Sequence, residues 1–202
     1  FKFYQALILV PTITLVEQWE DECKRFNFSH IIKVSSKNQG WRSEIDDIKL
    51  KESLAESDES SLSFIIITTY ASFSRESTFK QLMSLSKKIQ RQMLLIADEA
   101  HNIGAPNIMS KLDRVKILRR IGLSATPERQ FDDKGNKAVM QFFGCDAQYT
   151  FEYSMKEAID NGFLCRYRYF PHVVRLNEDE MAEYKKISLQ LAKFYNIDEG
   201  SF

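Results

Sequence analysis

The sequence predicts an α/β fold in which a parallel β-sheet is flanked by helices. Two observations lead to this prediction. Short, unbroken runs of apolar and β-branched residues recur along the first two thirds of the chain, and segments with helical spacing of apolar residues lie between them. Unbroken apolar runs are typical of strands that are buried on both faces, as in parallel sheets. Strands that alternate with helices indicate right-handed βαβ units.

Five runs are the candidate strands. They are 6–10, 31–34, 64–69, 93–97 and 117–123. Between the first two, we expect a helix capped by Thr12 or Thr14. Its apolar face consists of Leu15, Val16, Trp19, Cys23 and Phe26. A second helix is expected over 41–56, with Ile45 and Ile48 turned inward and its acidic residues outward.

The character of the chain changes in two places. Residues 52–63 are polar and rich in serine, which indicates the end of a helix followed by a surface loop. After Pro127, the turn-forming stretch 131–135 predicts another loop, and short helices are expected over 136–143 and 154–161. We therefore expect a sheet-containing domain over 1–150 and an extension over 151–202.

The extension should contain two further elements. Residues 166–176 read as an extended segment interrupted by Pro171. From Asn177 onward a helix is predicted, because Asn177 can cap it and Glu180 follows three residues later. Its apolar residues at helical spacing are Met181, Tyr184, Ile187, Leu191 and Phe194.

Composition sets limits on partners. Lys+Arg and Asp+Glu both number 28, so the formal net charge is zero and no global basic field indicates nucleic acid. Any contact with nucleic acid must therefore be local. The lysines and arginines at 87, 88 and 91 and at 114, 116, 119 and 120 form local clusters, which we leave unassigned because most such clusters are solvated surface.

Cysteine usage and hydropathy indicate the compartment. Cys23, Cys145 and Cys165 are far apart and form no CxxC pair, so we expect small buried residues in a reducing environment. No apolar run approaches the ~18 residues of a membrane span, and the start does not have the form of a signal peptide. We therefore expect a soluble, cytoplasmic protein with no membrane partner.

The apolar run at 93–97 is followed directly by Asp98, Glu99, Ala100 and His101. The carboxyl end of a strand is where an open α/β sheet places its ligand chemistry. The segment LLIADEAH resembles the Walker B, DEAH-type motif of superfamily 2 helicases and translocases. Three other segments match in order: ALILVPTITLVEQW at 6–19 resembles motif Ia, IIITTY at 65–70 resembles motif Ib, and GLSATPER at 122–129 resembles motif III.

The resemblance implies a fold and an activity. The fold is the RecA-like sheet of P-loop NTPases, here the first motor lobe, incomplete at its N-terminus and followed by a C-terminal extension. The activity is ATP hydrolysis coupled to movement on DNA, with ATP and Mg²⁺ as cofactors in the intact protein. Asp98 resembles the acid that holds Mg²⁺, directly or through water, and Glu99 resembles the acid that polarises the attacking water. The alternative is that both acids lie on a solvated turn.

Residues for coupling and for DNA contact follow from the same resemblance. His101 resembles the residue that joins the nucleotide site to motif III, so Ser124 and Thr126 become its expected hydrogen-bonding partners. Thr126 also has a simpler interpretation, because Thr-Pro-Glu is typical of a helix start.

Pro11, Thr12 and Thr69 resemble the residues that meet the sugar-phosphate backbone of one strand. For Thr12, helix capping is an equally good explanation.

Within superfamily 2, the amino-acid sequences of these motifs resemble those of restriction-enzyme motor subunits and excision-repair helicases. That likeness implies DNA as partner, a second RecA-like lobe, and candidate nuclease or methyltransferase partners. The stretch 157–170 also resembles the segment between the two lobes of restriction-type motors.

None of the seven glycines is followed by Lys-Ser or Lys-Thr, so these residues contain no phosphate-binding loop. We expect that loop upstream of Phe1, and we expect the isolated chain to be inactive and to bind no nucleotide tightly. Two other functions stay open: a non-catalytic lobe that binds DNA or protein, and a nuclease with its metal at Asp98, Glu99 and His101.

Overall fold

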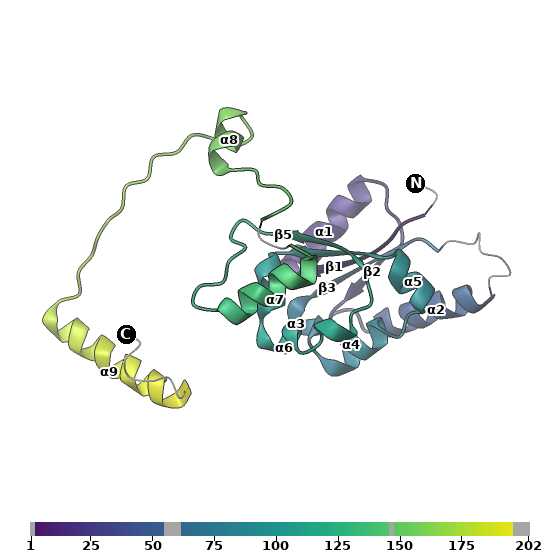
Figure 1. The fold of residues 1–202 in the computed structure, drawn as a ribbon, viewed down its shortest axis with the longest axis horizontal. Helices are drawn as coiled ribbons and strands as arrows, with labels where there is room; N and C mark the ends of the chain where they lie inside the picture. The colour runs from purple at the N-terminus through teal and green to yellow at the C-terminus, as the bar shows by residue number, and fades with distance from the viewer. Residues whose placement is uncertain (1–2, 55–61, 146–147, 196–202) are drawn as a thin grey trace. The chain divides into compact units, whose positions relative to one another are not determined.

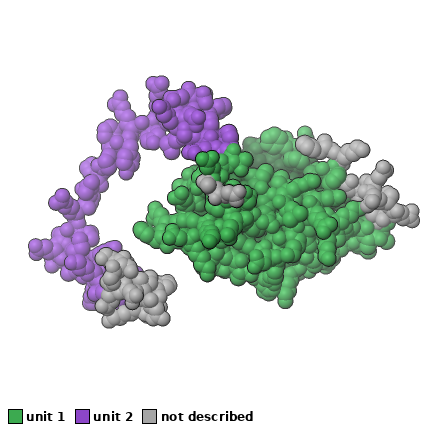
Figure 2. Space-filling view, viewed as in Figure 1, with its two compact units in different colours: residues 1–150 green, residues 151–202 purple. Residues whose placement is uncertain are grey.

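The computed structural model describes residues 3–54, 62–145 and 148–195. The chain divides into two compact units, Phe1–Thr150 and Phe151–Phe202, which Figure 2 draws in green and purple. The predicted surface loop after residue 54 falls largely on 55–61, outside the described residues. Each unit is described below by itself.

The first unit is built on a sheet of five parallel strands. They are β1 (Gln5–Val10), β2 (Ile31–Val34), β3 (Phe64–Thr69), β4 (Leu94–Asp98) and β5 (Arg119–Leu123). Their order in the sheet is β2-β3-β1-β4-β5, and every neighbouring pair is parallel. The α/β prediction is confirmed, and the observed strands lie within two residues of the predicted runs.

Helices cover both faces of this sheet (Figure 1). The helices of the first unit are α1 (Ile13–Arg25), α2 (Trp41–Leu54), α3 (Tyr70–Phe73), α4 (Glu76–Leu82), α5 (Lys87–Gln92), α6 (Pro106–Met109) and α7 (Asp133–Phe143), with 3₁₀ helices η1 (Ala100–Gly104) and η2 (Leu112–Arg114). Only α1, α2 and α7 were predicted. The others are three to seven residues long, too short to show a repeating apolar pattern.

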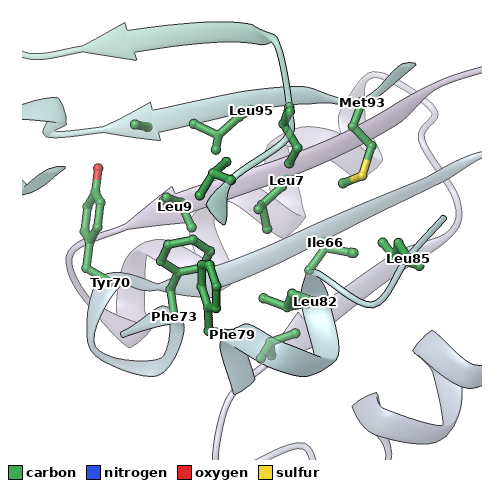
Figure 3. Close-up of a cluster of buried hydrophobic side chains, with 14 of the residues drawn as sticks. Leu7, Leu9, Ile66, Tyr70, Phe73, Phe79, Leu82, Leu85, Met93 and Leu95 are labelled. Atoms are coloured by element: carbon green, nitrogen blue, oxygen red, sulfur yellow. The ribbon is translucent and has the colours of Figure 1, made fainter. Parts of the chain in front are cut away.

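Alternate residues of β1, β3 and β4 point to two separate cores, as the period of a β-strand requires. Leu7, Leu9 and Ile66 face the larger core, where α3 and α4 contribute Phe73 and Phe79 (Figure 3). The opposite face forms a smaller core beneath α1. Its buried residues are Ile8, Val10, Val16, Cys23, Ile65 and Ile67. Burial of both faces explains why these strands read as unbroken apolar runs.

Strand β5 differs from the other four. Like β2, it lies at an edge of the sheet, and it pairs with β4 alone among the described strands; what sets it apart is its exposure. Ile121 and Leu123 are 45 % and 43 % exposed, whereas the described residues of β3 are all buried. This edge therefore presents unpaired main-chain groups next to apolar side chains.

Three local predictions were wrong. The segment 131–135 is not entirely loop, because α7 already begins at Asp133 with Asp132 as its cap. Phe26 does not join the apolar face of α1: it is the residue that ends the helix, and it is 74 % exposed. Cys165 is exposed and Cys145 is half-buried, so only Cys23 is the buried cysteine expected of all three.

The second unit contains two helices, α8 (Met155–Asp160) and α9 (Glu178–Tyr195). Ser154 and Glu157 form a reciprocal capping box at α8, and Asn177 and Glu180 exchange the equivalent bonds at α9, each at 2.9 Å. Residues 166–176 between them form neither helix nor strand. None of the helices in the described part of the chain is long and apolar enough to cross a membrane.

Candidate functional site

The carboxyl ends of three adjacent strands meet at one edge of the sheet. Val10 of β1 pairs with Thr69 of β3, and Leu9 of β1 pairs with Ala97 of β4, so these strands end at nearly the same height. The segments that follow them therefore lie next to one another. This is the edge at which open α/β sheets bind ligands.

Asp98 is the last residue of β4, and its carboxylate is held from two sides. The indole Nε1 of Trp19 donates to Oδ2 at 3.0 Å, and the main-chain N–H of Glu99 donates to Oδ1 at 3.0 Å. Each oxygen keeps lone pairs for a further partner. The carboxylate is thus oriented by α1 while remaining able to bind a cation.

Tyr70 fixes the main chain at the same point. Its hydroxyl donates to the carbonyl oxygen of Asp98 at 2.8 Å. Burial, together with the nearby carboxylates of Asp98 and Glu99, raises the pKa of the Tyr70 phenol above its usual range. Tyr70 therefore remains a protonated donor at any physiological pH.

Glu99 adopts the left-handed conformation, with φ 50° and ψ 58°. A non-glycine residue in this region costs on the order of 1–3 kcal/mol and persists only where its surroundings enforce the conformation. Asn102 does so, because its main-chain N–H and its side-chain amide both donate to the Glu99 carbonyl oxygen at 2.9 Å. The sharp turn starts η1 immediately after the strand and directs the Glu99 side chain toward the segment that follows β5.

Ser124 receives that side chain. Its hydroxyl donates to Glu99 Oε2 at 3.3 Å and lies 3.3 Å from His101 Nδ1, which is itself 3.5 Å from Glu99 Oε2. The structure thus brings Glu99, His101 and Ser124 into one cluster. Thr126 joins it only through its main-chain N–H, which donates to Ser124 Oγ at 3.2 Å.

Two expectations for Thr126 are wrong. Its side chain makes no hydrogen bond to His101 among the described residues, since Ser124 occupies that place. The segment Thr-Pro-Glu also starts no helix: residues 124–132 are irregular, and α7 begins at Asp133.

Arg129 extends the cluster. Its Nη1 donates to the His101 carbonyl oxygen at 3.2 Å, and its Nε pairs with Asp132 at 2.6 Å. A Cβ added to Gly104 would lie 2.7 Å from Arg129 Cδ and 2.7 Å from a main-chain oxygen, so this close approach requires glycine. The turn at residues 98–101 and the segment 124–129 are therefore packed against each other.

Pro11 and Thr12 follow the end of β1, and Thr69 is the last residue of β3, at the same edge. Thr12 caps α1 by accepting from the Leu15 N–H at 3.3 Å, and Thr69 caps α3 by accepting from the Ser72 N–H at 3.1 Å. Both threonines thus have a structural role, and contact with nucleic acid stays a prediction for all three residues.

The carboxylates fit a magnesium–nucleotide complex better than a self-sufficient metal site. Mg²⁺ is commonly bound by one or two carboxylates, with phosphate oxygens and water completing its octahedron. Asp98 provides one such carboxylate, with lone pairs free on both oxygens. Among the described residues, no three His, Cys, Asp or Glu side chains converge as a metal-binding group.

Comparison with known families gives an independent result. Residues 1–129 match the family model ResIII, described as the type III restriction enzyme, res subunit. The chain belongs to the ResIII family. Membership indicates a helicase-like motor domain of restriction enzymes, in agreement with the parallel sheet and with the superfamily 2 resemblance. A search of curated protein sequences finds no match to this ResIII chain.

Several residues of the ResIII site were not predicted as functional. The sequence pattern places Trp19 on the apolar face of a helix and Tyr70 at the end of the segment IIITTY, and neither position indicates a role at the site. A half-buried indole such as Trp19, or a buried phenol such as Tyr70, needs a partner for its N–H or O–H, and this requirement is the signal that could have pointed to them.

Part of the basic cluster at 114–120 is structural. Arg120 donates to three carbonyl oxygens, those of Val115, Ile117 and Phe142, and burial lowers its pKa. Arg114 pairs with Glu76 at 2.8 Å. Both guanidinium groups therefore stabilise the fold rather than offer free positive charge.

Proposed function

We propose that this ResIII chain is the greater part of the first motor lobe of an ATP-dependent DNA translocase or helicase in a restriction or DNA-processing system. One observation carries the proposal. Two carboxylates stand at the end of β4, one clamped by Trp19 and the other connected through Ser124 to the segment after β5. Family membership supports the same assignment.

The chemistry requires a cation and an oriented water. When bound, ATP would supply the phosphoryl group, and Mg²⁺ would neutralise the charge that develops on the phosphoryl oxygens. Asp98 would hold the cation, and the Trp19 hydrogen bond keeps its carboxylate in one orientation. Glu99 is 41 % exposed and accepts a proton from the attacking water.

Coupling uses the cluster around Ser124. A change in the position of Glu99 alters its contacts with Ser124 and His101. Arg129 bonds both to the His101 carbonyl oxygen and to Asp132, the cap of α7, so the displacement is passed on to the start of α7. Pro11, Thr12 and Thr69 face nucleic acid from the neighbouring strand ends. Main-chain N–H groups and small hydroxyls can bind phosphates without net positive charge, which agrees with the neutral composition.

The chain requires further parts for activity. Its seven glycines include no phosphate-binding loop, and ATP hydrolysis in this class closes two lobes around the nucleotide. We therefore expect residues 1–202 alone to bind ATP weakly and not to hydrolyse it. The intact protein would join this lobe to a second RecA-like lobe, with nuclease or methyltransferase partners in a restriction system.

The direct test is Glu99→Gln in the intact protein. Loss of the carboxylate should reduce DNA-stimulated ATP hydrolysis by about 10²-fold or more while ATP still binds, since general bases contribute about 10²–10⁴-fold. Glu17→Gln, an exposed change on α1, is the control and should hydrolyse ATP at the wild-type rate. Hydrolysis near the wild-type rate in Glu99→Gln refutes the role of Glu99. A wild-type protein that binds DNA without hydrolysing ATP indicates the non-catalytic lobe instead.

A further inference from the structure

A pocket of about 320 Å³ opens beside the carboxyl ends of β2 and β3, away from the carboxylate pair. The loop between β2 and α2 forms one wall, and the α3–α4 segment forms the other. β2 lies three strand positions from β4, which corresponds to about 14 Å at the usual spacing of ~4.8 Å between strands. Its polar lining includes Ser36, Asn38, Arg42, Ser72, Arg75 and Thr78.

The charge of this pocket is positive. Arg42 and Arg75 line it from opposite walls, and no aspartate or glutamate is among its lining residues. Neither arginine forms an ion pair within the described parts of the chain, unlike Arg25, Arg114 and Arg129. In a protein with zero net charge, two unneutralised guanidinium groups at one cavity create a local anion site.

Stacking and hydrogen bonds hold the residues of one pocket wall in place. Arg42 Cζ lies 4.5 Å from the ring centroid of Trp41, which is 4 % exposed, so stacking on a buried ring orients the guanidinium. Asn38 ties down the loop: its amide donates to the Lys33 carbonyl oxygen at 3.0 Å, and its oxygen accepts from the Gly40 N–H at 3.1 Å.

Hydroxyl groups complete the lining. Thr78 is only 5 % exposed yet faces the pocket, and its hydroxyl makes no hydrogen bond among the described residues. Ser72 connects the pocket to the strand end, because the Thr69 hydroxyl donates to Ser72 Oγ at 3.1 Å. The Thr69 hydroxyl is thus committed to Ser72, while Ser72 and Arg75 present the groups that can reach a ligand.

We infer that this pocket binds a phosphodiester group of the nucleic-acid strand, with Arg42 and Arg75 as its charged contacts. The inference rests on the proposed function. Guanidinium groups match phosphate oxygens in geometry and charge, and buried hydroxyls add neutral donors. A strand that passes the ends of β1 and β3 reaches this pocket next, because β2 is the neighbour of β3 on that side. The pocket therefore extends the contact surface beyond the residues of motifs Ia and Ib.

The test is binding of a fluorescent single-stranded oligonucleotide to the intact protein without ATP, measured by anisotropy over a series of salt concentrations. Arg42→Ala and Arg75→Ala should each weaken binding about five- to tenfold. Each should also reduce the slope of log K against log salt by about 0.7, the value for one lost phosphate contact on a single strand. Arg75→Lys should recover part of the affinity. Arg91→Ala is the matched control, since Arg91 is exposed on α5 at the opposite end of the sheet.

A second arm locates the phosphate. Oligonucleotides that carry one neutral methylphosphonate linkage, moved along the strand, should bind weakly to the wild type at one position. At that position Arg75→Ala should cause no further loss. Unchanged affinity and salt slope in both alanine variants overturn the inference. So does inorganic phosphate that stabilises the wild type against heat without competing with the oligonucleotide, which indicates a site for free phosphate. Failure of the wild type to bind any nucleic acid refutes the proposed function instead.

Discussion

The indole of Trp19 and the carboxylate of Asp98 are joined by a 3.0 Å hydrogen bond that spans 79 positions of the sequence. Through it, the helix that covers one face of the sheet sets the orientation of an acid at the sheet's edge. Groups that bond to a metal ligand commonly change metal affinity or activity by 10–100-fold when they are removed. We therefore expect Trp19 to act as a positioning residue for the proposed magnesium site at Asp98.

Trp19→Phe keeps the apolar ring and removes the donor. We expect the Mg²⁺ concentration for half-maximal ATP hydrolysis in the intact protein to rise about tenfold, because Asp98 is no longer held in one orientation. Tyr4→Phe is the control: it removes a hydroxyl that accepts from the Ser29 N–H at 3.0 Å before the start of β1, and it should lower stability by about 1 kcal/mol without changing the Mg²⁺ dependence. An identical Mg²⁺ dependence in wild type and Trp19→Phe contradicts the assignment.

Ser124→Ala removes the hydroxyl between Glu99 and His101. We expect the ratio of DNA-stimulated to basal ATP hydrolysis to fall several-fold, since Ser124 connects the carboxylate to the segment after β5. Steady-state rates with and without DNA measure this ratio, and Ser110→Ala, whose hydroxyl bonds only to a nearby carbonyl oxygen, is the control. An equal reduction of both rates would show that Ser124 supports hydrolysis alone.

The backbone of Glu99 makes a separate prediction about stability. Glu99→Gly and Glu99→Ala both lose the carboxylate, so both should lose DNA-stimulated hydrolysis. The glycine variant should nevertheless be more stable than the alanine variant by about 1 kcal/mol, because only glycine adopts φ 50° without strain. Denaturant unfolding of the pair measures the difference. Equal stability would mean that the turn relaxes when the side chain is removed.

Glu76 predicts a pH dependence. Arg114 and Lys111, at 2.8 and 2.7 Å, lower the pKa of its carboxyl from 4.5 to about 2. A depressed pKa stabilises the fold above the ordinary pKa, and that stabilisation is lost as pH falls from about 4.5 toward 2. The melting temperature of Glu76→Gln should therefore lie below that of the wild type at pH 7, and the gap should shrink as the pH is lowered to 3.

The exposed Glu17 on α1 makes no ion pair within the described residues and serves as control. Glu17→Gln should follow the wild type at both pH values. A gap between wild type and Glu76→Gln that is the same at pH 7 and pH 3 would contradict the assigned cause.

The strands and the long helices could be predicted because burial on two faces leaves a clear mark. Ile65, Ile66 and Ile67 form an unbroken run, since successive side chains enter different cores. The helices α3 to α6 left no such mark, because each is at most seven residues long and is held by tertiary contacts. Phe73 on α3 and Phe79 on α4 are both buried, with their ring centroids 5.3 Å apart. No local pattern in the sequence shows that these two rings are in contact.

For the site, the motif located Asp98 and Glu99 because the chemistry requires acids at a strand end. It did not reveal how they are held. Trp19 and Asp98 become neighbours only when β1 and β4 pair, and the left-handed turn at Glu99 is stabilised by Asn102, which carries no local signal for that conformation. Thr126 shows the converse: its local sequence favours a helix start, but the bond from its N–H to Ser124 and the two bonds between Arg129 and Asn136 hold the segment irregular.

The exposed edge at β5 has a practical consequence. A strand with free main-chain donors and acceptors and with uncovered Ile121 and Leu123 is a template on which a second polypeptide can add in register. A polypeptide of these 202 residues, purified by itself, should therefore aggregate through this strand as its concentration rises. Soluble material for crystallography or calorimetry will require another strand or a helix placed over that edge.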